Sequence, residues 1–273
     1  MKYSVQFGHR DKNRILILAK KIISINNINN NMSKIKELEE IIDSSDNIVF
    51  FGGAGVSTES GIPDFRSESG IFKSLEKYGD TPENLVSHSY YLDHTEEFFD
   101  YYKDNLIFKD AEPNPAHITL ANLEKAGKLK AVITQNIDGL HQKAGSKEVL
   151  ELHGSIHRNY CQICGKEYSL DYILESDGIP RCECGGVVKP DVVLYEEPLN
   201  NAVLSFAIDY ISNADTLIIG GTSLVVYPAA GLINYFKGKN LVLINKSETQ
   251  YDNLATLVIN DAIGETLSQI KVK

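Results

Sequence analysis

Residues 52–66 read Gly-Gly-Ala-Gly-Val-Ser-Thr-Glu-Ser-Gly-Ile-Pro-Asp-Phe-Arg and combine a glycine turn with an anion, an aromatic ring and a guanidinium. They follow the apolar run 47–51, and a buried strand that ends in a glycine turn lets backbone N–H groups approach a dinucleotide pyrophosphate. The ordinary dehydrogenase fingerprint is incomplete, because Thr58 stands where a third Gly or Ala is expected. The glycines alone are a weak signal. The continuation Gly-Ile-Pro-Asp-Phe-Arg favours a site that does chemistry on the dinucleotide itself.

All four cysteines of the chain lie in one segment, as Cys161-x-x-Cys164 and Cys182-x-Cys184 with 17 residues between the pairs. This spacing is typical of a structural zinc ribbon, and a disulfide is the weaker alternative in a reducing compartment. The second pair has one intervening residue instead of two, which strains the loop but leaves four thiolates. A closed four-thiolate site has no open coordination position, so the metal should fold the module and not activate water.

His153 is the candidate general base among seven histidines. An imidazole titrates near neutrality and can take a proton from a ribose hydroxyl. Its position after the apolar run 149–152 places it at the end of a predicted strand, whereas the alternative is a satisfied core histidine. His117 and His141 are expected to be structural, because each lies at a predicted helix start or turn without an acid–base partner in sequence.

From Met32 onward, short apolar runs alternate with helical patterns. This organisation predicts an α/β fold with a doubly wound, Rossmann-like parallel sheet that is covered on both faces. Ligands of such sheets bind outside the carboxyl ends of the strands, so the polar motifs that follow the strands should converge on one crevice. The predicted strands are Ile48–Phe51, Ala131–Thr134, Val149–Leu152, Val192–Tyr195, Leu217–Ile219, Leu241–Ile244 and Leu257–Ile259.

Two interruptions of this alternation predict a smaller module, made of helices at about 67–115 and the zinc ribbon at about 156–189. Residues 1–31 are treated as an extension to a catalytic domain at 32–273. A mis-assigned start codon and a mobile tail are both open explanations for the Asn- and Ile-rich tract that ends it. The apolar spacing of residues 33–42 predicts a helix with Ser33 as its N-cap.

The chain has 273 residues and a formal net charge of −10. This charge argues against a nucleic-acid partner and suits cationic protein substrates, which an acidic surface attracts. No apolar run approaches the roughly 20 residues that span a bilayer. No signal peptide is apparent, so we expect a cytoplasmic protein, and we expect a monomer.

Several motifs together resemble the sirtuins, in their bacterial type, which are NAD-dependent protein lysine deacylases. The resemblance runs in order from about Met32 to the C-terminus and is specific, since the motifs surround the cysteine ribbon. The motifs are residues 53–66, residues 134–141 (Thr-Gln-Asn-Ile-Asp-Gly-Leu-His), residues 152–154 (Leu-His-Gly), the four cysteines, residues 189–195 (Lys-Pro-Asp-Val-Val-Leu-Tyr) and residues 221–228 (Gly-Thr-Ser-Leu-Val-Val-Tyr-Pro).

The resemblance implies a role for each matching residue. Ala54, Thr58 and Arg66 would hold the phosphates, and Arg66 suits them because its fork binds oxygens bidentately. Gly53, Gly55 and Asp64 of the same loop would also belong to the cofactor site. Phe65 would cover the reacting ribose carbon and exclude water. The adenosine end would be lined by Gly221, Thr222, Ser223, Asn245 and Asp261, the nicotinamide-side ribose reached by Gln135, and the carboxamide gripped by Asn136, Ile137 and Asp138.

The implied reaction starts when the acyl oxygen of a modified lysine attacks the nicotinamide ribose and expels nicotinamide. His153 then deprotonates a ribose hydroxyl, which attacks the imidate carbon. Hydrolysis yields free lysine and O-acyl-ADP-ribose. The peptide would add as a strand through backbone pairing. Its expected contacts are Val192, Val193, Leu194, Tyr195 and Val225. The family commonly has Gly before Glu in the following loop, where this chain has Glu196.

Three other proteins that use the same cofactor are alternatives, and features of the sequence count against each of them. An NAD glycohydrolase or ADP-ribosyltransferase would have no need for the peptide strand, and a silent NAD sensor would not need His153 and Asn136. A dehydrogenase is not supported, because this chain lacks the third glycine of the fingerprint and an acidic residue at the end of a second strand. Sirtuins that prefer succinyl groups carry Tyr and Arg three residues apart. This chain has Tyr101 and Tyr102 but no Arg between Arg66 and Arg158, so acetyl groups are expected to be preferred.

Overall fold

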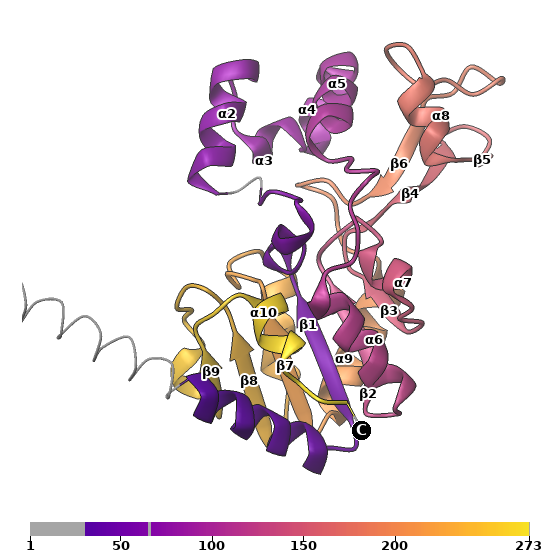
Figure 1. Ribbon diagram of the computed structural model, residues 1–273. Helices are drawn as coiled ribbons and strands as arrows, with labels where there is room; N and C mark the ends of the chain where they lie inside the picture. The colour runs from indigo at the N-terminus through magenta and orange to yellow at the C-terminus, as the bar shows by residue number, and fades with distance from the viewer. Residues whose placement is uncertain (1–30, 65–66, 273) are drawn as a thin grey trace, which may run out of the picture.

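The computed structural model describes residues 31–64 and 67–272. The expected extension, apart from its last residue, lies outside the described residues, as do Phe65 and Arg66. A parallel sheet forms one lobe, and Figure 1 shows helices α2 to α5 and strands β4 to β6 beyond one end of this sheet. Within the described ranges, no helix combines the length and apolar character needed to cross a bilayer.

The main sheet has six parallel strands in the order β3-β2-β1-β7-β8-β9. The chain runs from β1 outward to β3 and then returns to β7 on the other side of β1, which makes the β1/β7 boundary the topological switch point. In doubly wound sheets ligands bind at the carboxyl ends of strands beside such a point. The strands are β1 Ile48–Gly52, β2 Leu129–Thr134, β3 Val149–Glu151, β7 Thr216–Gly220, β8 Asn240–Ile244 and β9 Leu257–Ile259.

Helices cover both faces of this sheet, which explains why its central strands are apolar runs without polar alternation. Ile48 and Phe50 of β1 face one core, whereas Val49 and Phe51 face the other. The first core is completed by helix 31–44, α6 (Pro115–Lys125) and α10 (Ile263–Ser268). The second is completed by α9 (Asn201–Asn213) and the 3-10 helix η3 (Ala229–Tyr235). The expected α/β class is confirmed.

The second lobe is built from two segments that are far apart in sequence. The first supplies α2 (Glu68–Tyr78), α3 (Pro82–Leu85), α4 (His88–Asp93) and α5 (Thr95–Asn105). The second supplies the antiparallel strands β4 (Gly154–Cys161), β5 (Glu167–Tyr168) and β6 (Val188–Val192), with α8 (Leu170–Glu175). One hydrophobic core joins them, because Phe98, Phe99 and Tyr102 of α5 cluster with Ile156, Ile173 and Val188. The remaining short elements are η1 Ala54–Val56, η2 Thr58–Ser60, α7 Leu140–Ala144 and η4 Asp252–Leu254.

Two expectations about these elements are wrong. Residues 192–195 are not a strand of the parallel sheet: strand β6 ends at Val192 and pairs antiparallel with β4 in the small sheet. The apolar run looked like a doubly buried strand, but its buried Val192 and Leu194 pack into the core of the second lobe. Ser33 is not an N-cap either, since helix 31–44 already includes it.

Candidate active site

The carboxyl ends of four parallel strands are joined by direct hydrogen bonds. After β1 the chain turns into η1, and the Gly55 N–H donates to Gly221 O at 2.7 Å. A Cβ at Gly55 would lie 2.7 Å from Gly221 Cα, so this approach requires glycine. Gln135 Nε2 donates to Thr222 Oγ1 at 3.0 Å, and the Thr222 N–H donates to Asn245 Oδ1 at 2.9 Å. The motifs after β1, β2, β7 and β8 therefore meet as expected.

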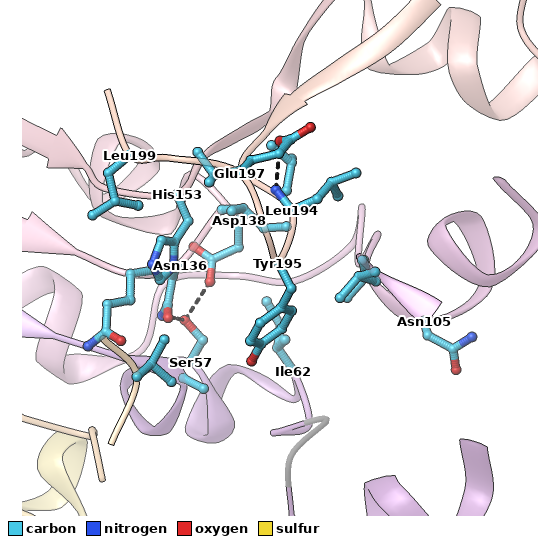
Figure 2. Close-up of a pocket in the computed structure, with 18 of the residues that line it drawn as sticks. Ser57, Ile62, Asn105, Asn136, Asp138, His153, Leu194, Tyr195, Glu197 and Leu199 are labelled. Atoms are coloured by element: carbon cyan, nitrogen blue, oxygen red, sulfur yellow. Dashed lines mark hydrogen bonds between the residues drawn. The ribbon is translucent and has the colours of Figure 1, made fainter. Parts of the chain in front are cut away.

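A cavity of about 220 Å³ lies between these strand ends and the second lobe. Figure 2 shows His153 and Asn136 on one side of it and Tyr195 with Ile62 near its middle. The cavity joins segments from both lobes, as a two-substrate site requires. Ten of the residues predicted from the sequence line it, namely Ala54, Gln135, Asn136, Ile137, Asp138, His153, Val192, Val193, Leu194 and Tyr195.

The His153 ring is oriented by the end of the neighbouring strand. Its Nδ1 lies 2.9 Å from the carbonyl oxygen of Gln135. A carbonyl can only accept, so Nδ1 carries a proton, and in the neutral form of the ring Nε2 is the nitrogen that can act as a base. The His153 carbonyl in turn accepts from the Val193 N–H at 2.9 Å. The candidate base is thus bonded both to the residue that follows β2 and to the residue that follows β6.

A hydrogen-bond network on the cavity wall was not predicted from the sequence. Ser57 is 1% exposed; its Oγ donates to Asp138 Oδ2 at 2.6 Å and accepts from Asn136 Nδ2 at 3.0 Å. Asp138 Oδ1 also accepts from the Leu140 N–H at 2.9 Å. These bonds fix the orientation of an amide and a carboxylate that both face the cavity (Figure 2). Ser57 sits inside the glycine motif, but nothing in its spacing indicates a contact with residues 80 positions away.

Other cavity residues come from the second lobe and from loops. Val86, Leu106 and Phe108 form part of an apolar wall beside Asn105. Their contribution depends on how the lobes are placed, which no local sequence pattern reports. The other lining residues that were not predicted are Ile62, Pro63, Glu196, Glu197, Leu199, Val226, Tyr227 and Pro228.

The remaining predicted residues lie outside this cavity lining. Val225 is 64% exposed and does not line the cavity, whereas its neighbour Val226 does. The Thr58 hydroxyl donates to Gly55 O at 2.9 Å, so contact with a phosphate would require it to rotate. The predicted residues of the strand-end loops that are not among the cavity-lining residues are Gly53, Gly55, Asp64, Gly221, Thr222, Ser223, Asn245 and Asp261.

The residues present fit a dinucleotide. Gly55 and Gly221 approach so closely that the backbone can face a ligand without intervening side chains. At the β8 end, Asn245 is 8% exposed, and its buried Nδ2 has no hydrogen-bond partner among the described residues. A buried donor without a partner is costly, and a ribose hydroxyl would satisfy it. Asp138 adds a carboxylate that can accept from an amide NH₂.

His117 and His141 lie below the site as a buried pair. Their ring centroids are 4.7 Å apart, and the two side chains are 0% and 1% exposed. Burial lowers the pKa of His117 to about 4 and that of His141 to about 3. Both rings are therefore neutral near pH 7, which agrees with the structural role expected for them.

The four cysteines form a compact cluster in the small sheet lobe. Their Sγ atoms lie within 4.8 Å of one another, with Cys161 to Cys184 at 3.4 Å and Cys164 to Cys182 at 3.5 Å. These separations are too long for disulfides, whose sulfurs are about 2.05 Å apart. They are close to the about 3.8 Å between ligands of a tetrahedral zinc–thiolate site with 2.3 Å bonds. The cluster fits a structural zinc ion.

Comparison with known proteins agrees with this geometry. The model of the Sir2 family matches residues 53–228, which is more than half of the chain. The chain belongs to the Sir2 family. The resemblance to the sirtuins is thereby confirmed.

Two relatives match this Sir2-family chain over nearly their full length. A Clostridium perfringens protein named NAD-dependent protein deacetylase is 66% identical over 239 residues, which cover 87% of this chain and 98% of the relative. A Clostridium acetobutylicum protein of the same name is 61% identical over 241 residues, which cover 88% of this chain and 98% of the relative.

Solved Sir2 structures have the same fold. One contains Sir2 with a deacetylated p53 peptide and 3'-O-acetyl ADP-ribose, and it matches with a TM-score of 0.78 and 42% identity over 86% of this chain and 96% of that one. Another contains Sir2 with a p53 peptide and NAD⁺, with a TM-score of 0.76 and 42% identity over 86% of this chain and 95% of that one.

Proposed function

We propose that the chain is an NAD-dependent protein lysine deacetylase, a transferase that passes the acyl group of a modified lysine to ADP-ribose and releases nicotinamide. One observation carries the proposal: His153, with Nδ1 bonded to the Gln135 carbonyl, lines a cavity shared by the strand-end loops and the segment 192–195. The names of the relatives and the peptide and nucleotide in the solved Sir2 structures support it.

Residues of this chain would perform three tasks. His153 Nε2 would accept a proton from a ribose hydroxyl, in the tautomer that the Gln135 carbonyl enforces. Asp138 and Asn136, held by Ser57, would orient the carboxamide before its bond breaks. NAD supplies the electrophilic ribose carbon and the leaving group. The apolar wall would exclude water, which would otherwise consume NAD without a peptide.

Acetylated lysine-containing proteins are the proposed partners. Val192 to Tyr195 and Val226 with Tyr227 all line the cavity, and an extended peptide would pair with the backbone of these segments. The charge of −10 suits cationic segments and disfavours nucleic acid. We also propose a cytoplasmic monomer that holds one structural Zn²⁺ through Cys161, Cys164, Cys182 and Cys184.

The test is an acetyl-lysine peptide incubated with NAD and the full chain. Nicotinamide should appear only when the acetylated peptide is present, and mass spectrometry should detect one O-acetyl-ADP-ribose per deacetylated peptide. Nicotinamide release without peptide would indicate an NAD glycohydrolase instead. NAD binding without any nicotinamide release would indicate a binding protein.

A further inference from the structure

Glu196 has a backbone conformation that glycine favours. Its φ is 75°, in the left-handed region where a side chain is strained. Glu196 also lines the cavity, directly after the segment proposed to pair with the peptide. A strained residue beside a substrate site needs contacts that hold it in place.

The Glu196 side chain makes those contacts with the second lobe. The Ser89 N–H donates to Glu196 Oε2 at 2.9 Å, and Ser89 Oγ donates to Oε1 at 3.0 Å. Ser89 is in the first turn of α4, where backbone N–H groups lack partners within the helix. Both carboxylate oxygens are therefore engaged.

The backbone just before Glu196 is tied to the same part of the lobe. The Tyr195 N–H donates to Val86 O at 3.0 Å, and the His88 N–H donates to Tyr195 O at 2.9 Å, which forms a parallel bridge. Neighbouring residues of an extended segment direct their backbone groups to opposite edges. Tyr195 uses the edge that faces α4. On the opposite edge, the Leu194 N–H donates to Glu197 Oε2 at 2.9 Å and the Leu194 carbonyl accepts from the Glu197 N–H at 3.0 Å. A substrate strand would therefore pair with the backbone of residue 196, whose direction depends on the turn there.

We propose that Glu196 is a positioning residue for the peptide substrate. The two hydrogen bonds that its carboxylate accepts from Ser89, called the clasp below, hold residue 196 in the left-handed conformation. They thereby align the backbone edge on which the peptide pairs. Glycine would reach this conformation without strain, whereas in this chain the carboxylate contacts stabilise it. The inference rests on the proposed function, because it needs a peptide in the cavity.

Four variants of the full chain separate conformation from charge. Glu196→Ala keeps a side chain that resists the conformation and loses the clasp. Glu196→Gly also loses the clasp but adopts the conformation freely. Glu196→Gln can still accept from Ser89 without a negative charge, and Ser89→Ala removes one of the two donors. The readouts are the KM for an acetyl-lysine peptide, the KM for NAD, kcat, and peptide Kd by fluorescence anisotropy.

The expected result is a roughly tenfold higher peptide KM and Kd for Glu196→Ala, with kcat and the KM for NAD within about twofold of the parent. Glu196→Gly and Glu196→Gln should restore most of the peptide affinity, and Ser89→Ala should lie between. Unchanged peptide affinity in Glu196→Ala would overturn the inference. So would Glu196→Gly binding as weakly as Glu196→Ala, because the side chain itself would then be needed.

The peptide Kd distinguishes a failure of the positioning role from a failure of the proposed deacetylation reaction. If the parent chain binds the acetylated peptide and the variants follow the expected order, but no nicotinamide is released, the proposed reaction fails and the positioning role stands. If the parent chain does not bind the peptide at all, the positioning role is overturned.

Discussion

His153 is oriented by a backbone carbonyl, and this partner sets its tautomer without adding a charge to the cavity. The carbonyl belongs to Gln135, whose side chain is bonded to Thr222 at the end of the next strand but one. The position of the proposed base thus depends on the order of the strands.

Replacing His153 with Ala should lower kcat for deacetylation by at least about 100-fold, because it removes a general base. The fold should be retained, since the ring lies at the cavity and outside the three hydrophobic cores. Nicotinamide release and a thermal melt measure the two effects. His94→Ala, which changes an exposed histidine outside the cavity, is the matched control. Residual turnover above a few per cent of the parent would refute the assignment.

Lys103, the one basic residue of helix α5, is bonded outside the cavity lining. Lys103 Nζ donates to Ser176 O at 2.7 Å and to Gly178 O at 3.2 Å, in the cysteine-bearing segment. Three residues after Tyr101 stands Asp104, an anion that pairs with Lys77 at 2.6 Å. Neither residue lines the cavity, whereas the uncharged Asn105 does.

Acetyl-lysine should therefore be turned over at least about tenfold faster than succinyl-lysine in the same peptide, because a buried carboxylate without a cation is costly. Steady-state turnover on the two peptides measures the ratio. Asn105→Arg should shift the ratio toward succinyl, and Lys103→Ala should leave it unchanged. A strong loss of succinyl activity in Lys103→Ala would show that the lysine reaches the substrate.

At the scale of elements, the metal cluster supports more than its own loops. Cys161 and Cys182 belong to the same core as the aromatic residues of α5. Loss of the zinc ion would expose one side of that core. It would also loosen the apolar cavity wall at Val86, Leu106 and Phe108, which follow helices α3 and α5. The ribbon is therefore expected to act on activity through the folding of the second lobe.

Cys161→Ala and Cys184→Ala should each yield an unstable chain with less than one zinc ion, because structural zinc contributes folding free energy directly. Elemental analysis and thermal melts with and without a chelator provide the measurement. Glu183→Ala, between the two cysteines of the second pair, is the control and should keep one zinc ion per chain. A folded, active preparation of the parent chain without zinc would contradict this.

The sequence predicted the elements whose signals are local. Runs such as 48–51 were assigned correctly as strands, because a strand buried on both faces is uniformly apolar. Residues 192–195 were misassigned, since burial in a different core produces the same run. The Ser57 network and the wall at Val86 and Leu106 arise from contacts between distant segments, which no local pattern encodes.

At the scale of the whole molecule, the His117–His141 pair couples fold stability to pH. The pair lies among α6, α7 and β1, where His141 also contacts the Phe50 ring. In the unfolded chain a histidine takes up a proton near pH 6.5. In the folded chain burial lowers the pKa values to about 4 and about 3. Between these limits the unfolded state binds more protons, so acid favours unfolding.

The free energy of unfolding should be highest above about pH 6.5 and should fall as the pH is lowered toward 4. Each buried histidine contributes at most about 1.4 kcal/mol per pH unit in this window. Urea unfolding at a series of pH values measures the slope. His141→Phe should flatten it, whereas His94→Ala should not. An equal slope in His141→Phe would show that other groups dominate acid unfolding.

The single core shared by residues 67–115 and 154–192 also has a consequence for the order in which the protein can fold during synthesis. The helical segment leaves the ribosome first, but Phe98, Phe99 and Tyr102 find Ile156, Ile173 and Val188 only after strands β2 and β3 of the main sheet and the cysteine segment have been made. Until then these aromatic rings lack their partners and are open to chaperones or to aggregation. Zinc capture therefore comes late, and it completes the burial of helices that were translated long before it.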